Sequence, residues 1–228
     1  MKRRMIKVVA AFASACMVAS SFAGAAFAAE GDGSTPRNET LYFAGQQWGA
    51  INDWNPMSAN SNNAMGIQQK DATRTLIYET LFMYNLLDNK MYPLLGTEYS
   101  WDDDNMSSMT VKLNPDAKWS DGTAVTAADV AATFDYNVKC QSSYGVEMTA
   151  YIESITAVDD QTVTIKTVVG EDGKAVNQLM VQQMLGKMYI MQKAYLETVE
   201  ARCESPEAMK LDPMDDLVAS GPYKPYYD

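Results

Sequence analysis

The chain has 228 residues, 47% of them hydrophobic and 21% charged, with a formal net charge of −11 and no histidine. This length and composition are typical of a globular protein with a sizeable core, and the negative charge argues against binding to nucleic acid or to an anionic lipid surface. The absence of histidine from this sequence excludes a histidine-based catalytic triad and a histidine metal site within it.

Residues 1–28 have the three parts of a secretory signal peptide. Basic side chains lie among residues 2–7, an apolar run covers residues 8–22, and Ala26-Phe27-Ala28 supplies the small residues of a cleavage site. The apolar run is too short and too rich in alanine for a convincing transmembrane anchor. We therefore predict an exported protein, secreted or periplasmic, with cleavage after Ala28.

Cys16 raises lipid anchoring as a competing interpretation. A lipoprotein signal has a leucine-like residue three positions before its cysteine, where this chain has Ala13. The residues after Cys16 also stay apolar, whereas an anchored protein needs a polar tether there. Free secretion is therefore favoured over an anchor at Cys16.

A first strand is predicted for residues 40–46, and the loops that follow hold the candidate ligand contacts. A tryptophan ring can stack on a sugar or pack against a peptide side chain, and asparagine offers both a donor and acceptors. The candidates are Trp48, Trp54, Asn55, Asn60, Asn62 and Asn63. For the two tryptophans, packing inside the protein is the open alternative.

The next elements follow from hydrophobic spacing. Ile77, Leu81, Tyr84 and Leu87 recur at helical intervals and predict a helix over residues 66–87. Short strands are predicted around residues 97–101 and 108–113, the second from strict alternation of apolar and polar residues.

Residues 118–130 carry the clearest local signals. Asp121-Gly122 predicts a tight turn, in which glycine can take a positive φ. Thr126 and Asp129 have the spacing of a capping box, which predicts a helix from Ala127. We expect these residues, together with Trp119, to have a structural role rather than to contact a ligand.

The second half is predicted to contain a hairpin and a long helix. Residues 152–158 and 161–168 alternate in hydrophobicity around Asp159-Asp160. A helix is expected from about residue 175 to residue 203, before the proline breaks. Its methionines at helical spacing are interpreted as core residues rather than a Cu(I) site; they are Met180, Met184, Met188 and Met191.

Cys140 and Cys203 are the two cysteines that remain after cleavage of the signal peptide. Disulfides persist in exported proteins, but spacing alone does not show whether two cysteines face each other. A disulfide between them and two unpaired thiols both remain open.

Four motifs, in order along the chain, resemble the signature of the family 5 bacterial extracellular solute-binding proteins, the peptide receptors of ABC importers. They lie at residues 76–82, 93–104, 118–130 and 220–224. The third contains Trp119-Ser120-Asp121-Gly122 and Thr126-Ala127-Ala128-Asp129, and the fourth contains Gly221-Pro222-Tyr223. The second motif resembles the family's "pgLAesw" stretch, and the first resembles a helix of the family.

The resemblance implies a mixed α/β fold of the class II periplasmic-binding-protein type, with two lobes. By analogy, residues 29–56 begin lobe I, residues 57–217 form its extra subdomain, and residues 218–228 return to lobe I. Family chains continue into a second lobe, so we expect this chain to be an amino-terminal piece holding only the first lobe and its subdomain. Since such receptors close two lobes over the ligand by hinge motion, one lobe alone should bind weakly.

The resemblance also implies a binding protein rather than an enzyme, monomeric and without a cofactor or metal. The expected ligand is a short oligopeptide, delivered to the ABC permease subunits in the membrane. Residues 46–49 and 52–56 also resemble the cello-oligosaccharide-binding branch, so a β-linked oligosaccharide is the alternative ligand. A peptide-sensing signalling receptor is a further alternative. A glycosidase with paired carboxylates is disfavoured, because the acidic pairs of this chain lie in predicted solvated turns.

Overall fold

The computed structural model describes residues 53–58 and 75–223. The strands are β1 (Phe82–Asn85), β2 (Lys90–Pro93), β3 (Gly96–Trp101), β4 (Ser108–Leu113), β5 (Ile152–Asp159) and β6 (Thr162–Thr167). The helices are α2 (Ala127–Lys139), α3 (Ser143–Met148), α4 (Gln178–Leu185), α5 (Lys193–Arg202) and the 3-10 helix η3 (Pro206–Leu211). The predicted signal peptide and the predicted strand at residues 40–46 lie outside the described residues.

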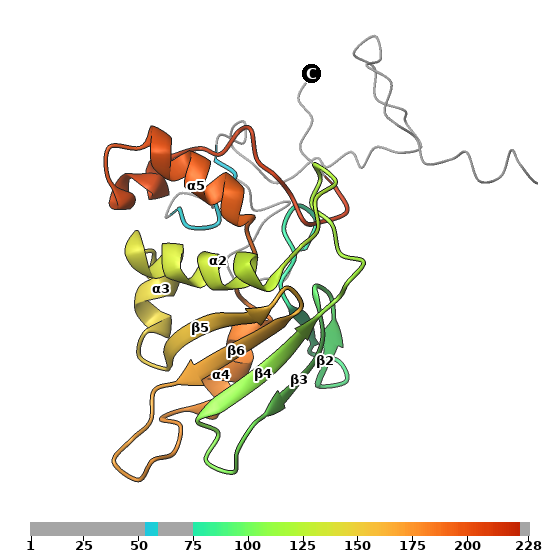
Figure 1. Cartoon of the computed structure of the whole chain (residues 1–228), viewed down its shortest axis with the longest axis vertical. Helices are drawn as coiled ribbons and strands as arrows, with labels where there is room; N and C mark the ends of the chain where they lie inside the picture. Colours follow the sequence, from blue (N-terminus) through green and yellow to red (C-terminus); the bar gives the residue numbers. More distant parts are fainter. Residues whose placement is uncertain (1–52, 59–74, 224–228) are drawn as a thin grey trace, which may run out of the picture. The chain divides into compact units, whose positions relative to one another are not determined.

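A four-stranded antiparallel sheet with the order β3-β4-β6-β5 forms the centre of the described part (Figure 1). On its buried face, cross-strand neighbours form apolar rows, such as Met109 opposite Ile165 and Ile165 opposite Ile155. The intervening residues of β4 and β6 point to a more exposed, polar face, which includes Lys112 and Lys166. This alternation is typical of an antiparallel sheet that is covered on one side.

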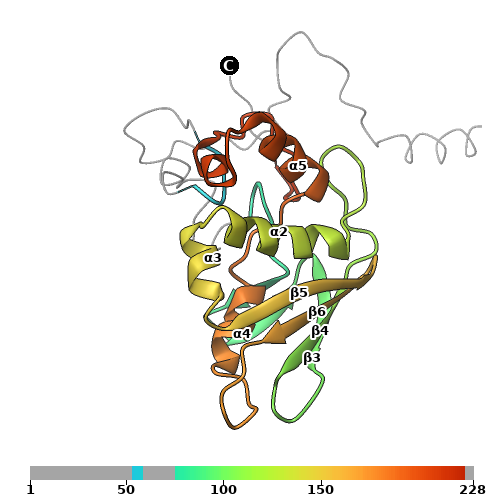
Figure 2. The same ribbon diagram turned by 60° about the vertical axis from the view of Figure 1, so that its left-hand side comes forward.

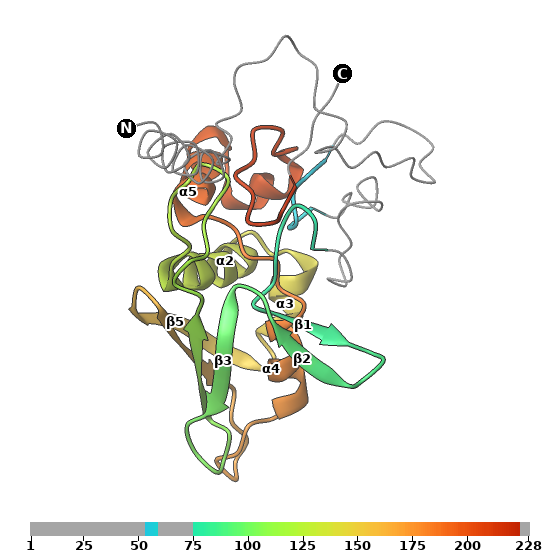
Figure 3. The same ribbon diagram turned by 90° about the vertical axis from the view of Figure 1, so that its right-hand side faces the viewer.

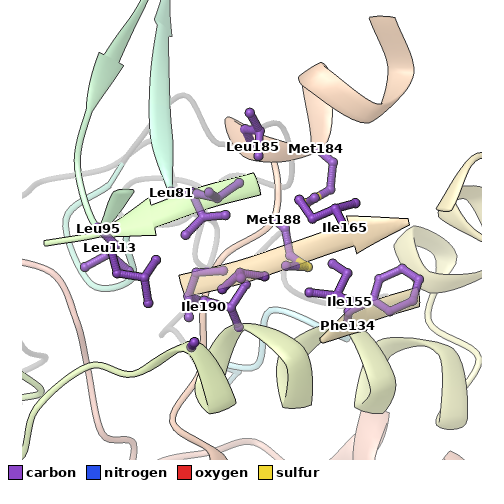
Figure 4. Close-up of a cluster of buried hydrophobic side chains, with 14 of the residues drawn as sticks. Leu81, Leu95, Leu113, Phe134, Ile155, Ile165, Met184, Leu185, Met188 and Ile190 are labelled. Carbon is purple, nitrogen blue, oxygen red and sulfur yellow. The ribbon is translucent and has the colours of Figure 1, made fainter. Parts of the chain in front are cut away.

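Helix α2 lies against this sheet, and α5 lies on the other side of α2 (Figures 1 and 2). Val130 and Phe134 of α2 join the core that the sheet forms, and Met184 and Leu185 of α4 belong to the same core (Figure 4). A second core, in which Ala132 meets α5 residues, lies on the opposite side of α2. Helix α2 is therefore buried on two faces, which explains why so few of its residues are exposed.

The predicted strands and hairpin in the middle of the chain are confirmed. Residues 97–101 and 108–113 fall in the paired strands β3 and β4, and residues 152–158 and 161–168 form β5 and β6. The predicted helix from Ala127 is also confirmed as α2, with Thr126 as its N-cap and a capping box. The mixed α/β class follows from these elements.

The predicted helix over residues 66–87 is wrong where the structure describes it. Residues 75–81 have no regular helix, and β1 and β2 form a two-stranded hairpin that is separate from the four-stranded sheet (Figure 3). Ile77 and Leu81 are buried as predicted, but Leu87 is 96% exposed in the hairpin turn. Pairing with residues 90–93 overrode the helical spacing, and Asn89, with φ of 60°, sits in the turn that permits this pairing.

The predicted helix over residues 175–203 is interrupted. Helix α4 ends at Leu185 with Gly186 as its C-cap, and α5 starts only at Lys193. Between them the chain makes contacts outside any helix: the Ile190 amide donates to the Glu79 carbonyl at 2.9 Å. Helix α3, with Ser142 as its N-cap, had no sequence prediction. Among the helices of the described ranges, none is long and apolar enough to cross a membrane.

Candidate functional site

Three sequence motifs meet at one place, which we call the motif seam (residues 76–79, 119–120 and 219–223). The Gly221 amide donates to the Ile77 carbonyl at 2.8 Å, and the Tyr223 amide donates to the Leu76 carbonyl at 3.0 Å. The Ser120 amide donates to the Ala219 carbonyl at 2.8 Å, which brings in the third motif. Stretches that are far apart in sequence are therefore held together mainly by backbone hydrogen bonds.

Gly221 has a steric reason to be glycine. A Cβ atom built there would lie 2.4 Å from the carbonyl oxygen and 2.7 Å from the carbonyl carbon of Leu76. Both are backbone atoms, so neither can turn aside as a side chain could. Pro222 and Tyr223 are exposed at the edge of the seam.

Asp129 connects four groups beside the seam. One carboxylate oxygen accepts hydrogen bonds from the Thr126 amide at 2.8 Å, the Thr126 hydroxyl at 3.0 Å and the Trp119 indole Nε1 at 3.2 Å. The other oxygen accepts from the Lys193 amide at 2.8 Å, at the start of α5. Trp119 and Asp129 are both buried. These contacts join the cap of α2 to α5 and support the predicted structural role.

The Asp121-Gly122 turn is also formed as predicted. Gly122 has φ of 87°, a conformation that other residues rarely adopt. Hydrogen bonds from the Thr123 hydroxyl, and also one from Gln192, hold the pKa of Asp121 below its ordinary value. The Gln192 contact ties the turn to the residue that precedes α5.

Trp54 and Asn55, two of the predicted ligand contacts, are inside the protein. They are 1% and 0% exposed. The Asn55 side-chain amide donates to the carbonyls of Met209 at 2.7 Å and Asp212 at 3.0 Å, and its oxygen accepts from the Met57 amide. Their surroundings in the described residues are those of packing residues, which was the open alternative for Trp54. The other predicted contacts, Trp48, Asn60, Asn62 and Asn63, lie outside the described residues, so they stay predictions.

The methionines at helical spacing and the two cysteines are mostly buried. Met184, Met188 and Met191 are buried as expected, and Met180 is only half-buried. Leu179, next to Met180, is exposed. Cys140 is buried with its sulfur 3.6 Å from the Met57 sulfur, Cys203 is half-buried, and both are free thiols. Over residues 53–58 and 75–223, no group of three or more histidine, cysteine, aspartate or glutamate side chains is placed to hold a metal ion.

A pocket of about 160 Å³ lies next to this core, and sequence patterns gave no indication of it. Its walls come from residues 56–58, from the α2–α3 junction and from residues 187–189. The side chains on it are both apolar and charged, including Met188, Tyr144, Glu147 and Lys187. We call it the α2–α3 pocket.

Tyr144 has an unusual hydroxyl in this pocket wall. The oxygen is buried and has no hydrogen-bond partner in the part of the chain that the structure describes. A buried hydroxyl without a partner costs about 1–3 kcal/mol. Burial, and then the nearby Glu147 carboxylate, raise the pKa of Tyr144 well above its ordinary value, so the group is a neutral hydroxyl.

Comparison with known proteins identifies a family model and several relatives. Residues 90–226 match the model of the bacterial extracellular solute-binding proteins, family 5, middle region. The probable peptide-binding protein YejA of Agrobacterium fabrum is 26% identical over 195 residues, which cover 83% of this chain and 28% of that protein.

Two solved structures resemble the chain. A Thermotoga maritima structure described as a mannohexaose-bound periplasmic oligopeptide-binding protein of an ABC transporter has 28% identity and a TM-score of 0.64, covering 83% of this chain and 32% of that one. The Agrobacterium protein AgaA, solved with agropinic acid, has 26% identity and a TM-score of 0.50, covering 65% of this chain and 27% of that one.

The similarity confirms the class II periplasmic-binding-protein-like fold. The chain spans about a third, or less, of the length of these relatives.

Proposed function

The chain belongs to family 5 of the bacterial extracellular solute-binding proteins, and we propose that the protein captures a short oligopeptide outside the membrane and delivers it to the permease subunits of an ABC importer. The observation that carries this proposal is the family match over residues 90–226, supported by relatives named for peptide binding. An extracellular role requires export, which the predicted signal peptide of residues 1–28 would provide. Free secretion remains our proposal over an anchor at Cys16.

The structure is consistent with binding rather than catalysis. The motif seam and the Asp129 contacts use the family's signature residues to hold backbone segments in place. Capture of a solute requires a rigid scaffold and a complementary surface, and no covalent step. We therefore infer that the protein is not an enzyme, and we propose that it is a monomer, as the family resemblance implies.

We propose that the ligand contacts come from Trp48, Asn60, Asn62 and Asn63. Trp54 and Asn55 would contribute indirectly, because the Asn55 hydrogen bonds to Met209 and Asp212 fix the segment that leads into this region. We also keep the proposed boundaries, with the subdomain at residues 57–217 between two parts of lobe I.

A β-linked oligosaccharide is the second candidate ligand. The supporting observation is the similarity to a protein whose structure contains mannohexaose although it is described as oligopeptide-binding. Trp48 could stack on a sugar ring as readily as on a peptide side chain, so the fold alone does not decide between the two.

The test is a direct binding measurement on the complete protein. Tetra-alanine and a nonapeptide would be compared with cellotetraose and mannohexaose by tryptophan fluorescence and calorimetry. The proposal expects binding of the peptides, weakened by Trp48→Ala and unaffected by Trp101→Ala, a control on β3. Binding of oligosaccharides alone would replace the peptide by the second ligand, and binding of neither class would overturn both.

A further inference from the structure

Part of the wall of the α2–α3 pocket is apolar, beside serine and asparagine side chains. Met57, Met188 and Tyr189 line it and are 3%, 2% and 6% exposed. A cavity of roughly 150 Å³ lined by apolar side chains is large enough to bind benzene. At about 160 Å³, the pocket can therefore hold one ring-sized apolar group.

The pocket also carries one positive and one negative charge. The Lys187 ammonium lies 3.9 Å from the Glu147 carboxylate, and these side chains are 27% and 45% exposed. An ion pair this long and this accessible to water is weak, so a ligand can replace it at little cost. The two charges are close enough to match an ammonium and a carboxylate that belong to the same small molecule.

The Tyr144 hydroxyl adds a third recognition element. The hydroxyl is buried and has no hydrogen-bond partner among the described residues, and the Tyr144 side chain contributes to the wall of the pocket. Buried hydroxyls in folded proteins usually have a hydrogen-bond partner. A bound molecule with a polar atom near the hydroxyl would provide the missing hydrogen bond.

We propose that the α2–α3 pocket binds a free amino acid with a ring-sized apolar side chain. Lys187 would pair with its carboxylate and Glu147 with its ammonium. An amino acid carries these two groups on a single carbon atom, whereas the terminal charges of an oligopeptide are separated by its whole backbone. The side chain of the ligand would lie between Met57 and Met188. This site is additional to the oligopeptide site proposed above and does not depend on it.

The experiment uses calorimetry on the complete protein, with L-phenylalanine as the probe. Two analogues each lack one charge: 2-phenylethylamine has no carboxylate, and 3-phenylpropionate has no ammonium. We expect each analogue to bind about tenfold or more weakly, the effect of losing one charge-assisted hydrogen bond. Equal binding of the three molecules, or no binding of L-phenylalanine, would overturn the proposal.

Substitutions at Lys187 and Glu147 test which side chain pairs with which charge of the ligand. Lys187→Met should abolish the preference for L-phenylalanine over 2-phenylethylamine, and Glu147→Gln should abolish its preference over 3-phenylpropionate. Lys193→Met removes an equally long ion pair, to Glu197 on α5, and serves as the matched control that leaves binding unchanged. A wild-type pattern in Lys187→Met and Glu147→Gln would place the binding elsewhere and refute this site.

Tyr144→Phe tests the hydroxyl. If the ligand reaches it, wild type should bind L-tyrosine and L-phenylalanine with different affinities, and the variant should bind them alike. An unchanged ratio of the two affinities would contradict this part of the proposal. An end-blocked nonapeptide cannot form the two ion pairs, so its binding reports on the oligopeptide proposal separately.

Discussion

Replacing Asp129 with alanine is expected to destabilise the fold by about 3 kcal/mol. The substitution removes the acceptor of four hydrogen bonds at 2.8–3.2 Å, donated by two groups of Thr126, by Trp119 and by Lys193. Loss of the helix cap contributes about 1 kcal/mol. The indole N–H of Trp119, 3% exposed, is left without an acceptor, which contributes about 1–3 kcal/mol. The Lys193 amide is less buried, so water can replace part of that bond.

Equilibrium unfolding in urea, followed by circular dichroism and tryptophan fluorescence, measures this loss. Asp135→Ala is the matched control, since Asp135 is an exposed aspartate on the same helix; its effect should stay within about 0.5 kcal/mol. Thr126→Ala removes one of the four donors and should lie between the two. If Asp129→Ala destabilised the chain no more than Asp135→Ala, Asp129 would not hold α2 and α5 together as the structure indicates.

Three further predictions concern burial and close packing. Burial raises the pKa of the Glu79 carboxyl, so its contribution to folding stability is present below about pH 4.5 and is lost as the pH rises through the raised pKa. Glu79→Gln should therefore become more stable relative to wild type as the pH rises from about 4 to about 7. Urea-unfolding free energies of the two proteins that change in parallel with pH would contradict this. Gly221→Ala places a Cβ against the Leu76 backbone and should cost about 1–3 kcal/mol or more; an unchanged thermal midpoint would show that the seam yields easily. Met184→Ala, at a fully buried position, should lower the free energy of unfolding by about 2–5 kcal/mol. Met180→Ala, at a half-buried position, should lower it clearly less. Equal losses of stability in calorimetry would contradict the difference in burial.

The elements that sequence reasoning predicted correctly are those with local causes. The capping box of Thr126 and Asp129 lies within four residues, and the turn at Gly122 depends on its own backbone. The alternation in β4 reflects which side chains face the core. Each of these signals is complete within a short stretch of sequence, so no distant partner is needed to interpret it.

The errors have two causes: a hairpin turn that carries no recognisable sequence signal, and a contact with a distant residue. Residues 82–85 pair with residues 90–93 across a turn that lacks the usual glycine-containing hairpin sequence. They form a strand although their hydrophobic spacing predicted a helix. The interruption after Gly186 is supported by the Ile190 hydrogen bond to Glu79, more than a hundred residues earlier.

The candidate site was harder to predict for the second of these reasons. Asn55 finds its hydrogen-bond partners at Met209 and Asp212, and no local pattern shows that its amide is buried. The α2–α3 pocket combines three separate stretches of the chain. Tyr144 and Lys187, in particular, have no neighbours in sequence that mark them as binding residues.

The motif seam has a consequence for how the stretch between residues 77 and 221 can change in evolution. The segments that enter and leave this stretch lie side by side. The backbone hydrogen bonds from Gly221 to Ile77 and from Tyr223 to Leu76 hold them together. A module attached through adjacent ends can be enlarged, trimmed or exchanged without altering the path of the chain on the other side of the attachment. The close packing at Gly221 therefore restricts which residues can occupy the motif seam. It places no such restriction on the sequence of the parts that lie far from the seam.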